Sequence, residues 1–187
     1  IRFSSLVVSP FDTRIKFSEL ILNEILHAQR GKEAYINLKL NNLVDKQMIN
    51  LLYQASKSGV KIKLTVRGIC CLIPGRAGLS ENIEVRSIVG RYLEHSRVIE
   101  FGNAGNPLIY ISSADWMGRN LDKRIEVSMP VLDKKLISEL RSYFALQWSD
   151  NQKSRIIDAD QTNPYFIEGE AKIDAQQERY NELKELL

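Results

Sequence analysis

The sequence predicts an α/β fold whose sheet is mixed, mainly parallel and flanked by helices. Apolar residues alternate with polar ones in some segments and recur at every third or fourth position in the segments between them, which is the pattern of strands separated by helices. Hydrophobic residues make up 44% of the 187 residues, enough for a buried core. No integral membrane segment is predicted, because the sequence lacks a continuous apolar run of the roughly 18–20 residues that a membrane helix needs.

Strands and helices alternate over the first third of the chain. Strands are predicted at Ser5–Ser9, Ala34–Asn41 and Val60–Arg67, where apolar residues run together or alternate with polar ones. Apolar residues at helical spacing predict two helices between them, over 17–31 and 45–59; the second begins at an aspartate N-cap and ends at a glycine. This order implies parallel strands joined by right-handed crossovers.

Three polar side chains are expected at one edge of this sheet. Lys39, Asn41 and Arg67 lie at the ends of the second and third predicted strands. In open α/β sheets, ligands bind beside the carboxyl ends of the parallel strands. The sequence therefore predicts a polar site at this edge.

The rest of the chain is less regular. A long loop rich in glycine and proline follows the third strand, and an apolar stripe over 136–148 predicts a closing helix. Short strands are expected around Ile83–Val85, Val98–Phe101, Leu108–Ile111 and Ile125–Val131. We divide the chain into one domain, residues 1–165, and an acidic, helical tail, residues 166–187.

The net charge and the cysteines limit the classes of protein to which the chain can belong. The net charge is +3, but residues 166–187 carry −3, so residues 1–165 carry +6. This basic balance suits an anionic ligand but is too small for a dedicated nucleic-acid binder. The adjacent Cys70 and Cys71 match neither a disulfide framework nor a metal-ligand spacing. With Ile1 at the start and no secretory signal, we expect a piece of a longer cytoplasmic protein, with membrane association left open.

Of the two histidines, His95 is the candidate for chemistry. His27 lies within a predicted helix, where a surface or boundary position is the simplest interpretation, whereas His95 lies between Arg91 and Arg97. An imidazole framed by guanidinium groups can act on phosphate as a nucleophile or proton carrier while the arginines hold the oxygens. On this local pattern alone, a purely structural role remains equally open.

Several enzyme classes are excluded by missing motifs. The sequence contains neither the GxxxxGK[ST] phosphate loop nor the GxGxxG dinucleotide fingerprint. It also lacks clustered histidines or carboxylates, so no dedicated metal site is predicted. If the chain takes part in phosphoryl transfer, the positive charge must come from arginines, a lysine and a metal carried by the nucleotide.

Four segments resemble the polyphosphate kinase family. They are SPFDTR, LKLNNLVDKQMINLLYQASKSGVKIKLTVRGICCLIPG, LSENIEVRSIVGRYLEHSRVIEFGN and IYISSADWMGRNLDKRIEVSMPV. The resemblance covers about Ser9 to Val131 and implies the family's C-terminal phospholipase D-like catalytic domain, which closes a shared active site with a preceding domain of the same chain. It also implies reversible transfer of the terminal phosphoryl of ATP to polyphosphate through a phosphohistidine in that preceding domain.

The resemblance also implies roles for individual residues. Arg67 resembles the arginine that binds nucleotide phosphates, and His95 resembles the second essential histidine, which faces the transferred phosphoryl. We also predict that Lys39 and Arg97 bind phosphate groups. The implied substrates are ATP or ADP with Mg²⁺ and polyphosphate, with no nucleic acid. We expect a homo-oligomer in the intact enzyme and no activity from the isolated fragment.

The phospholipase D motif itself is only partly kept. His95 and Arg97 occupy the His and Lys positions of its His-x-Lys pattern. Gly102 stands where the phospholipase D motif has an aspartate. The resemblance further implies that Ser113, Asn120 and Glu126 orient the surroundings of His95. Two alternatives stay open: a phospholipase D-like phosphodiesterase or nuclease, which Gly102 disfavours, and a catalytically silent module that binds polyanions.

Overall fold

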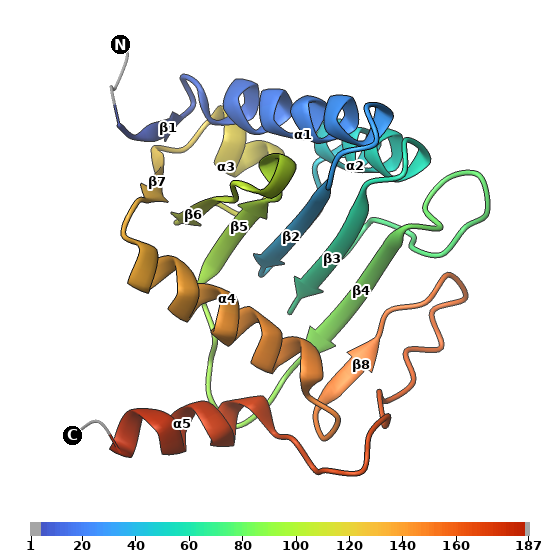
Figure 1. The fold of residues 1–187 in the computed structure, drawn as a ribbon, viewed down its shortest axis with the longest axis vertical. Coiled ribbons are helices and arrows are strands. Elements are labelled where there is room, and N and C mark those ends of the chain that lie inside the picture. The colour runs from blue at the N-terminus through green and yellow to red at the C-terminus, as the bar shows by residue number, and fades with distance from the viewer. Residues whose placement is uncertain (1–4, 186–187) are drawn as a thin grey trace.

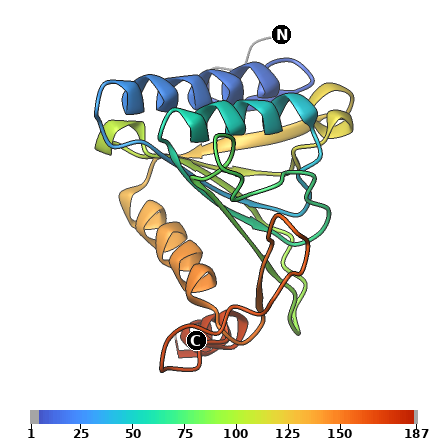
Figure 2. The same cartoon turned by 90° about the vertical axis from the view of Figure 1, so that its right-hand side faces the viewer.

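The computed structural model describes residues 5–185, and its centre is one 8-stranded sheet in the order β1-β7-β6-β5-β2-β3-β4-β8. Figures 1 and 2 show helices α1 and α2 side by side on one face of the sheet and α4 on the other. The strands are β1 (Val7–Ser9), β2 (Tyr35–Leu40), β3 (Lys61–Val66), β4 (Ile83–Ile88), β5 (Arg97–Phe101), β6 (Leu108–Ser112), β7 (Glu126–Val131) and β8 (Ser154–Ile156).

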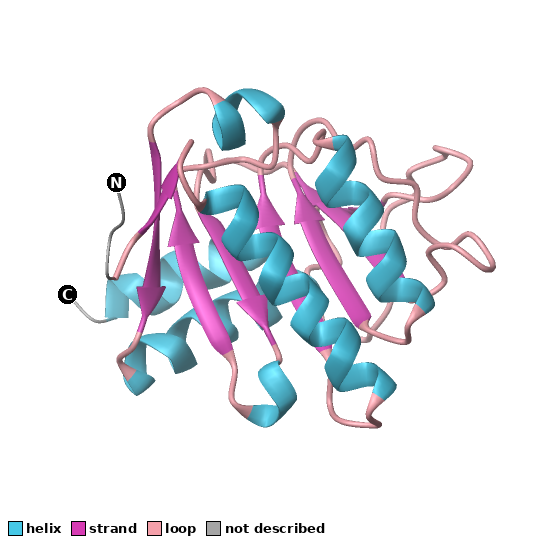
Figure 3. Cartoon of the chain, turned by 90° about the horizontal axis from the view of Figure 1, so that it is seen from above, coloured by secondary structure: helices cyan, strands magenta, loops and turns pink. Residues whose placement is uncertain are grey.

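The α/β class and the mixed sheet are confirmed, but the sheet is less parallel than predicted. Strands β2, β3 and β4 pair in parallel, and every other pairing of described strands is antiparallel. Strands β5 and β6 are joined by a short turn that allows only antiparallel neighbours, whereas a longer connection, which contains a helix at Gly118–Asp122, joins β6 to β7. Figure 3 shows this change of direction along the sheet.

The helices begin and end close to the predicted positions. They are α1 (Thr13–Gln29), α2 (Lys46–Lys57), the short α3 (Gly118–Asp122), α4 (Lys134–Ser149) and α5 (Ala175–Glu185), with a 3₁₀ turn at Asn103–Gly105. Asp45 is the N-cap of α2, where its carboxylate accepts a hydrogen bond from the Met48 amide at 3.0 Å. Helix α3 and strand β8 are additions that the sequence patterns did not predict.

The core lies between the sheet and the α1–α2 layer. Ile36 and Leu38 of β2 point into it, and Phe17 of α1 packs against Trp116, with ring centroids 5.9 Å apart. The alternating residues of β2, such as Lys39, therefore point to the opposite face, which α4 covers. A period of two along the strand thus separates the core face from the polar face.

The tail consists of an irregular segment followed by α5, which packs against α4. Residues 1–4 of the predicted domain and residues 186–187 of the predicted tail lie outside the described residues. Among the helices of residues 5–185, none combines the length and apolar character that crossing a bilayer requires.

Candidate active site

Arg67 lies directly after β3, at the carboxyl edge that the sequence predicted. Its Nε donates a hydrogen bond to Asn41 Oδ1 at 2.8 Å, and residues 5–185 provide it with no ion-pair partner. Because Asn41 Oδ1 accepts this bond, Asn41 Nδ2 is a donor, and it is buried without a partner in the described chain. A cation and an unsatisfied donor side by side favour an anion at this edge.

Asp115 joins the ends of two neighbouring strands, and sequence reasoning missed it as a site residue. Its Oδ1 accepts hydrogen bonds from the backbone amides of Asn41 and Asn42, at 2.9 and 3.1 Å. Both Asp115 oxygens lie 3.2 Å from Arg97, one from Nε and one from Nη2. This bidentate pair is buried, with Arg97 8% and Asp115 4% exposed, so it holds the guanidinium in one orientation.

Arg97 in turn lies against His95. Its Nη1 is 3.2 Å from His95 Nδ1 and donates to the His95 carbonyl at 2.8 Å, while Nη2 is 3.3 Å from Nε2. The imidazole itself is exposed, in the loop before β5. Arg97 therefore lies close to both ring nitrogens of a histidine that is exposed to solvent.

The Asp115 carboxylate is also a source of pH-dependent stability. Burial acts to raise its pKa, but hydrogen bonds from Arg97 and Asn42 outweigh burial and hold the pKa below its usual value. A lowered pKa contributes stability above the unfolded value of about 3.9 and loses it as the pH falls through the folded pKa.

We therefore expect Asp115→Asn to affect stability less in acid than at neutral pH. The difference in unfolding free energy between the parent chain and the variant should be full at pH 7 and shrink below about pH 4, since protonation removes the charge that the variant lacks. Urea unfolding of both proteins across this range measures the difference. A gap that stays constant would contradict the expectation.

Lys39 is not a free phosphate ligand in this structure. It is 4% exposed, and its Nζ lies 3.0 Å from Glu94 Oε2. Burial lowers the pKa of Lys39, although Glu94 opposes this shift. Burial acts to raise the pKa of Glu94, but Lys39 and Tyr143 hold it below its usual value. Lys39 is thus paired with Glu94, the residue that precedes His95.

Ser113, Asn120 and Glu126 form a cluster of their own. Glu126 accepts hydrogen bonds from the Ser113 hydroxyl and, at 2.6 Å, from Asn120 Nδ2. The Ser113 hydroxyl also accepts from the Val127 amide at 3.1 Å. No hydrogen bond within residues 5–185 joins this cluster to His95, so any orienting effect would act through the segment that contains Asp115.

Gly102 leaves no room for the aspartate of the phospholipase D motif. A Cβ atom there would lie 2.6 Å from Cδ1 and 2.8 Å from Cε1 of the Tyr35 ring. The carboxylate that pairs with Arg97 comes instead from Asp115, which lies farther along the chain. Arg97 thus has a carboxylate partner although position 102 is a glycine.

Arg14, from the SPFDTR segment, stabilises the framework below the site. Its guanidinium bonds both Asp45 oxygens at 2.8 and 2.7 Å, and it also pairs with Asp122. The hydrogen bonds that Arg14 donates to these two aspartates raise its pKa. One side chain thus joins α1, the start of α2 and the end of α3.

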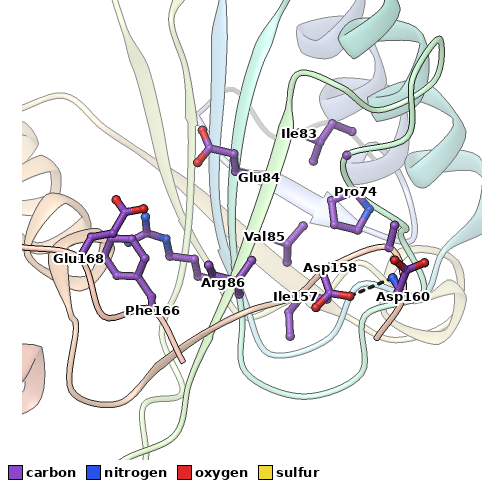
Figure 4. Close-up of a pocket in the computed structure, with 13 residues that line it drawn as sticks. Pro74, Ile83, Glu84, Val85, Arg86, Ile157, Asp158, Asp160, Phe166 and Glu168 are labelled. Atoms are coloured by element: carbon purple, nitrogen blue, oxygen red, sulfur yellow. Dashed lines mark hydrogen bonds between the residues drawn. The ribbon is translucent and has the colours of Figure 1, made fainter. Parts of the chain in front are cut away.

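A separate pocket of about 480 Å³ lies between β4 and β8, and none of the predicted site residues lines it (Figure 4). The Arg86 guanidinium at this edge lies 4.3 Å from the centroid of the Trp148 ring and 3.6 Å from that of Phe166. Both distances are typical of cation–π contacts. The part of the chain that the structure describes contains no group of three or more His, Cys, Asp or Glu residues placed to hold a metal ion.

Comparison with known proteins agrees with the resemblance seen in the sequence. A family profile for the "Polyphosphate kinase C-terminal domain 2" matches residues 6–176. The chain is 49% identical to polyphosphate kinase from Yersinia pestis over 187 residues, which is 100% of this chain and 27% of that protein. The chain thus spans about a quarter of the length of the curated relatives that it matches.

Solved structures agree on the fold. The crystal structure of polyphosphate kinase from Porphyromonas gingivalis superposes with a TM-score of 0.95 at 45% identity, covering 98% of this chain and 28% of that one. The phospholipase D family member Nuc from Salmonella typhimurium superposes with a TM-score of 0.56 at 17% identity, covering 82% of this chain and 96% of that one. The phospholipase D-like fold is therefore confirmed.

Proposed function

Because the chain belongs to the polyphosphate kinase C-terminal domain 2 family, we propose that it forms one wall of an active site that transfers the terminal phosphoryl of ATP to polyphosphate. The rest of that site, including the histidine that becomes phosphorylated, belongs to a preceding part of the protein. The isolated chain is then inactive. Its own contribution is to bind phosphate oxygens and to place His95.

One observation carries this proposal: a continuous series of hydrogen bonds connects Arg67 to His95. It runs from Arg67 to the Asn41 side chain, from the Asn41 backbone to Asp115, and from Asp115 through Arg97 to His95. An anion-binding arginine and a reactive imidazole are thus held in one fixed relation at the carboxyl edge of the sheet. Preorganised charge of this kind is the main catalytic device in phosphoryl transfer.

The proposed reaction has two balanced steps. The bond between the γ-phosphorus of ATP and its bridging oxygen breaks, a phosphorus–nitrogen bond to the histidine of the preceding part forms, and ADP leaves. That phosphorus–nitrogen bond then breaks as an oxygen of the terminal phosphate of polyphosphate bonds to the phosphorus. His95 acts beside the transferred group, as a proton donor to the leaving oxygen or as an electrostatic stabiliser. Mg²⁺ enters with the nucleotide.

The Gly102 position argues against the phosphodiesterase alternative. A phosphodiesterase of the phospholipase D type needs an aspartate at position 102. The Tyr35 ring leaves no room for it. The likeness to Nuc lies in the fold alone, and fold does not determine chemistry. Phosphoryl transfer from ATP is therefore the function that we propose.

Arg67→Ala is expected to weaken ATP binding by about 10- to 100-fold, since a charge-assisted hydrogen bond contributes roughly 1.5–3 kcal/mol. The measurement is the Kd for ATP in the full-length protein, together with phosphoryl transfer from γ-labelled ATP into acid-stable chains. Arg76→Ala is the matched control, because Arg76 is an exposed arginine in the loop after β3. If both variants bind ATP as the parent does, the proposed role of Arg67 is wrong.

A further inference from the structure

The loop that carries His95 contacts a helix about 80 residues farther along the chain. Figure 1 shows the connection between β4 and β5 running down to α5. Gln176 of α5, 7% exposed, holds this loop with its side-chain amide. Its Oε1 accepts from the Tyr92 amide at 2.9 Å, while its Nε2 donates to the Tyr92 carbonyl at 2.8 Å and to Glu94 Oε1 at 3.1 Å.

The contact between the loop and α5 is close. A Cβ atom at Gly90 would lie 2.8 Å from Cδ of Gln176, so any larger residue there would displace the amide. Beside it, the rings of Tyr92 and Tyr180 stack with centroids 6.1 Å apart. The part of the loop that contains Gly90 and Tyr92 therefore packs directly against α5.

Helix α5 is itself fixed to the end of α4, independently of the loop. Asp150, which is fully buried, accepts a hydrogen bond from the Ala175 amide at 2.8 Å. The Asn151 side chain accepts from the Ile173 amide at 2.8 Å and donates to the Ala171 carbonyl at 2.7 Å. The helix is thus a fixed support rather than a loose end of the chain.

Glu94 passes this support on to His95. Besides Gln176, it contacts Lys39 at 3.0 Å, Tyr143 at 2.5 Å and Gln147. A residue held by partners from β2, α4 and α5 has little freedom to move. Because Glu94 directly precedes His95, the position of its backbone determines the position of the His95 side chain.

We propose that Gln176 is a positioning residue for His95, so that the acidic tail helps to build the active site. The inference rests on the proposed function, since it assigns the tail a part in the same reaction. Gln176 contacts none of the groups proposed to bind phosphate. Its effect reaches His95 through Tyr92 and Glu94. An imidazole displaced by even about 1 Å loses much of its catalytic effect.

The test uses the full-length protein with Gln176→Met, which keeps the length of the side chain and loses its three hydrogen bonds. At a temperature where the variant is fully folded, its kcat for polyphosphate synthesis should fall about 10- to 100-fold, while the KM for ATP stays close to that of the parent. The lost hydrogen bonds are expected to lower the thermal midpoint. Gln177→Met is the matched control: Gln177 is the next residue of α5, is exposed, and its side-chain amide donates to Asn181 of the same helix. It should change none of the three quantities.

Gly90→Ala gives an independent test, because it keeps Gln176 but displaces its amide. The same loss of kcat with an unchanged KM is expected. The inference is overturned if Gln176→Met, measured where it is fully folded, turns over like Gln177→Met, or if its kcat falls only in step with the affinity for ATP. An inactive parent protein would instead contradict the proposed function, so the two failures can be told apart.

Discussion

Replacing His95 with alanine is expected to reduce polyphosphate synthesis by about 10³-fold, within the range that a general acid or a fixed electrostatic group contributes. The imidazole is exposed, while Arg97 and Asp115 fix it from behind. Removing an exposed ring leaves this buried ion pair in place. ATP binding through Arg67 should therefore persist, and the loss should appear in kcat with the affinity for ATP close to that of the parent.

The experiment compares the full-length parent with His95→Ala and with His27→Ala. His27 is the matched control because it is the other histidine of this chain and lies in α1, on the far side of the core. Phosphoryl transfer from γ-labelled ATP, the Kd for ATP and the thermal midpoint are measured for all three. Synthesis by His95→Ala at the parental rate would make this domain a scaffold and our assignment wrong.

The central part of the fold could be predicted because local patterns determine it. Period-two alternation places Ile36 and Leu38 in the core, and an aspartate N-cap marks the start of α2. Strand β8 could not be predicted in this way, since it has three residues, two of them exposed. Helix α3 is also short, and it is held by contacts such as that between Arg14 and Asp122, which are distant in sequence.

The positively charged residues of the candidate site could be predicted from the sequence, but the carboxylates that pair with them could not. Lys39 and Arg67 could be placed at one edge because parallel strands end together. That Lys39 pairs with Glu94 depends on how α4 and α5 close the polar face. Asp115 belongs to the IYISSADWMGRNLDKRIEVSMPV segment, but its acceptor role depends on two backbone amides that only the folded chain brings together.

Asp115→Asn should produce the largest combined effect on stability and activity. The substitution leaves the Arg97 guanidinium buried without its carboxylate, and breaking a buried ion pair costs about 3 kcal/mol of unfolding free energy. Arg97 then no longer holds the His95 ring in one place. We expect kcat to fall about 10²-fold even at temperatures where the variant is fully folded, since a small displacement of a catalytic group has an effect of this size.

The matched control is Asp160→Asn, which removes the same charge from an exposed loop position. Urea unfolding of the 187-residue chain gives the change in stability, and synthesis by the full-length protein gives the change in kcat. A variant that loses stability but keeps the parental kcat would show that Asp115 only supports the fold. Loss of both, with Asp160→Asn unchanged, would place the Asp115–Arg97 pair within the machinery that orients His95, since a neutral amide retains the shape of the carboxylate but not its charge.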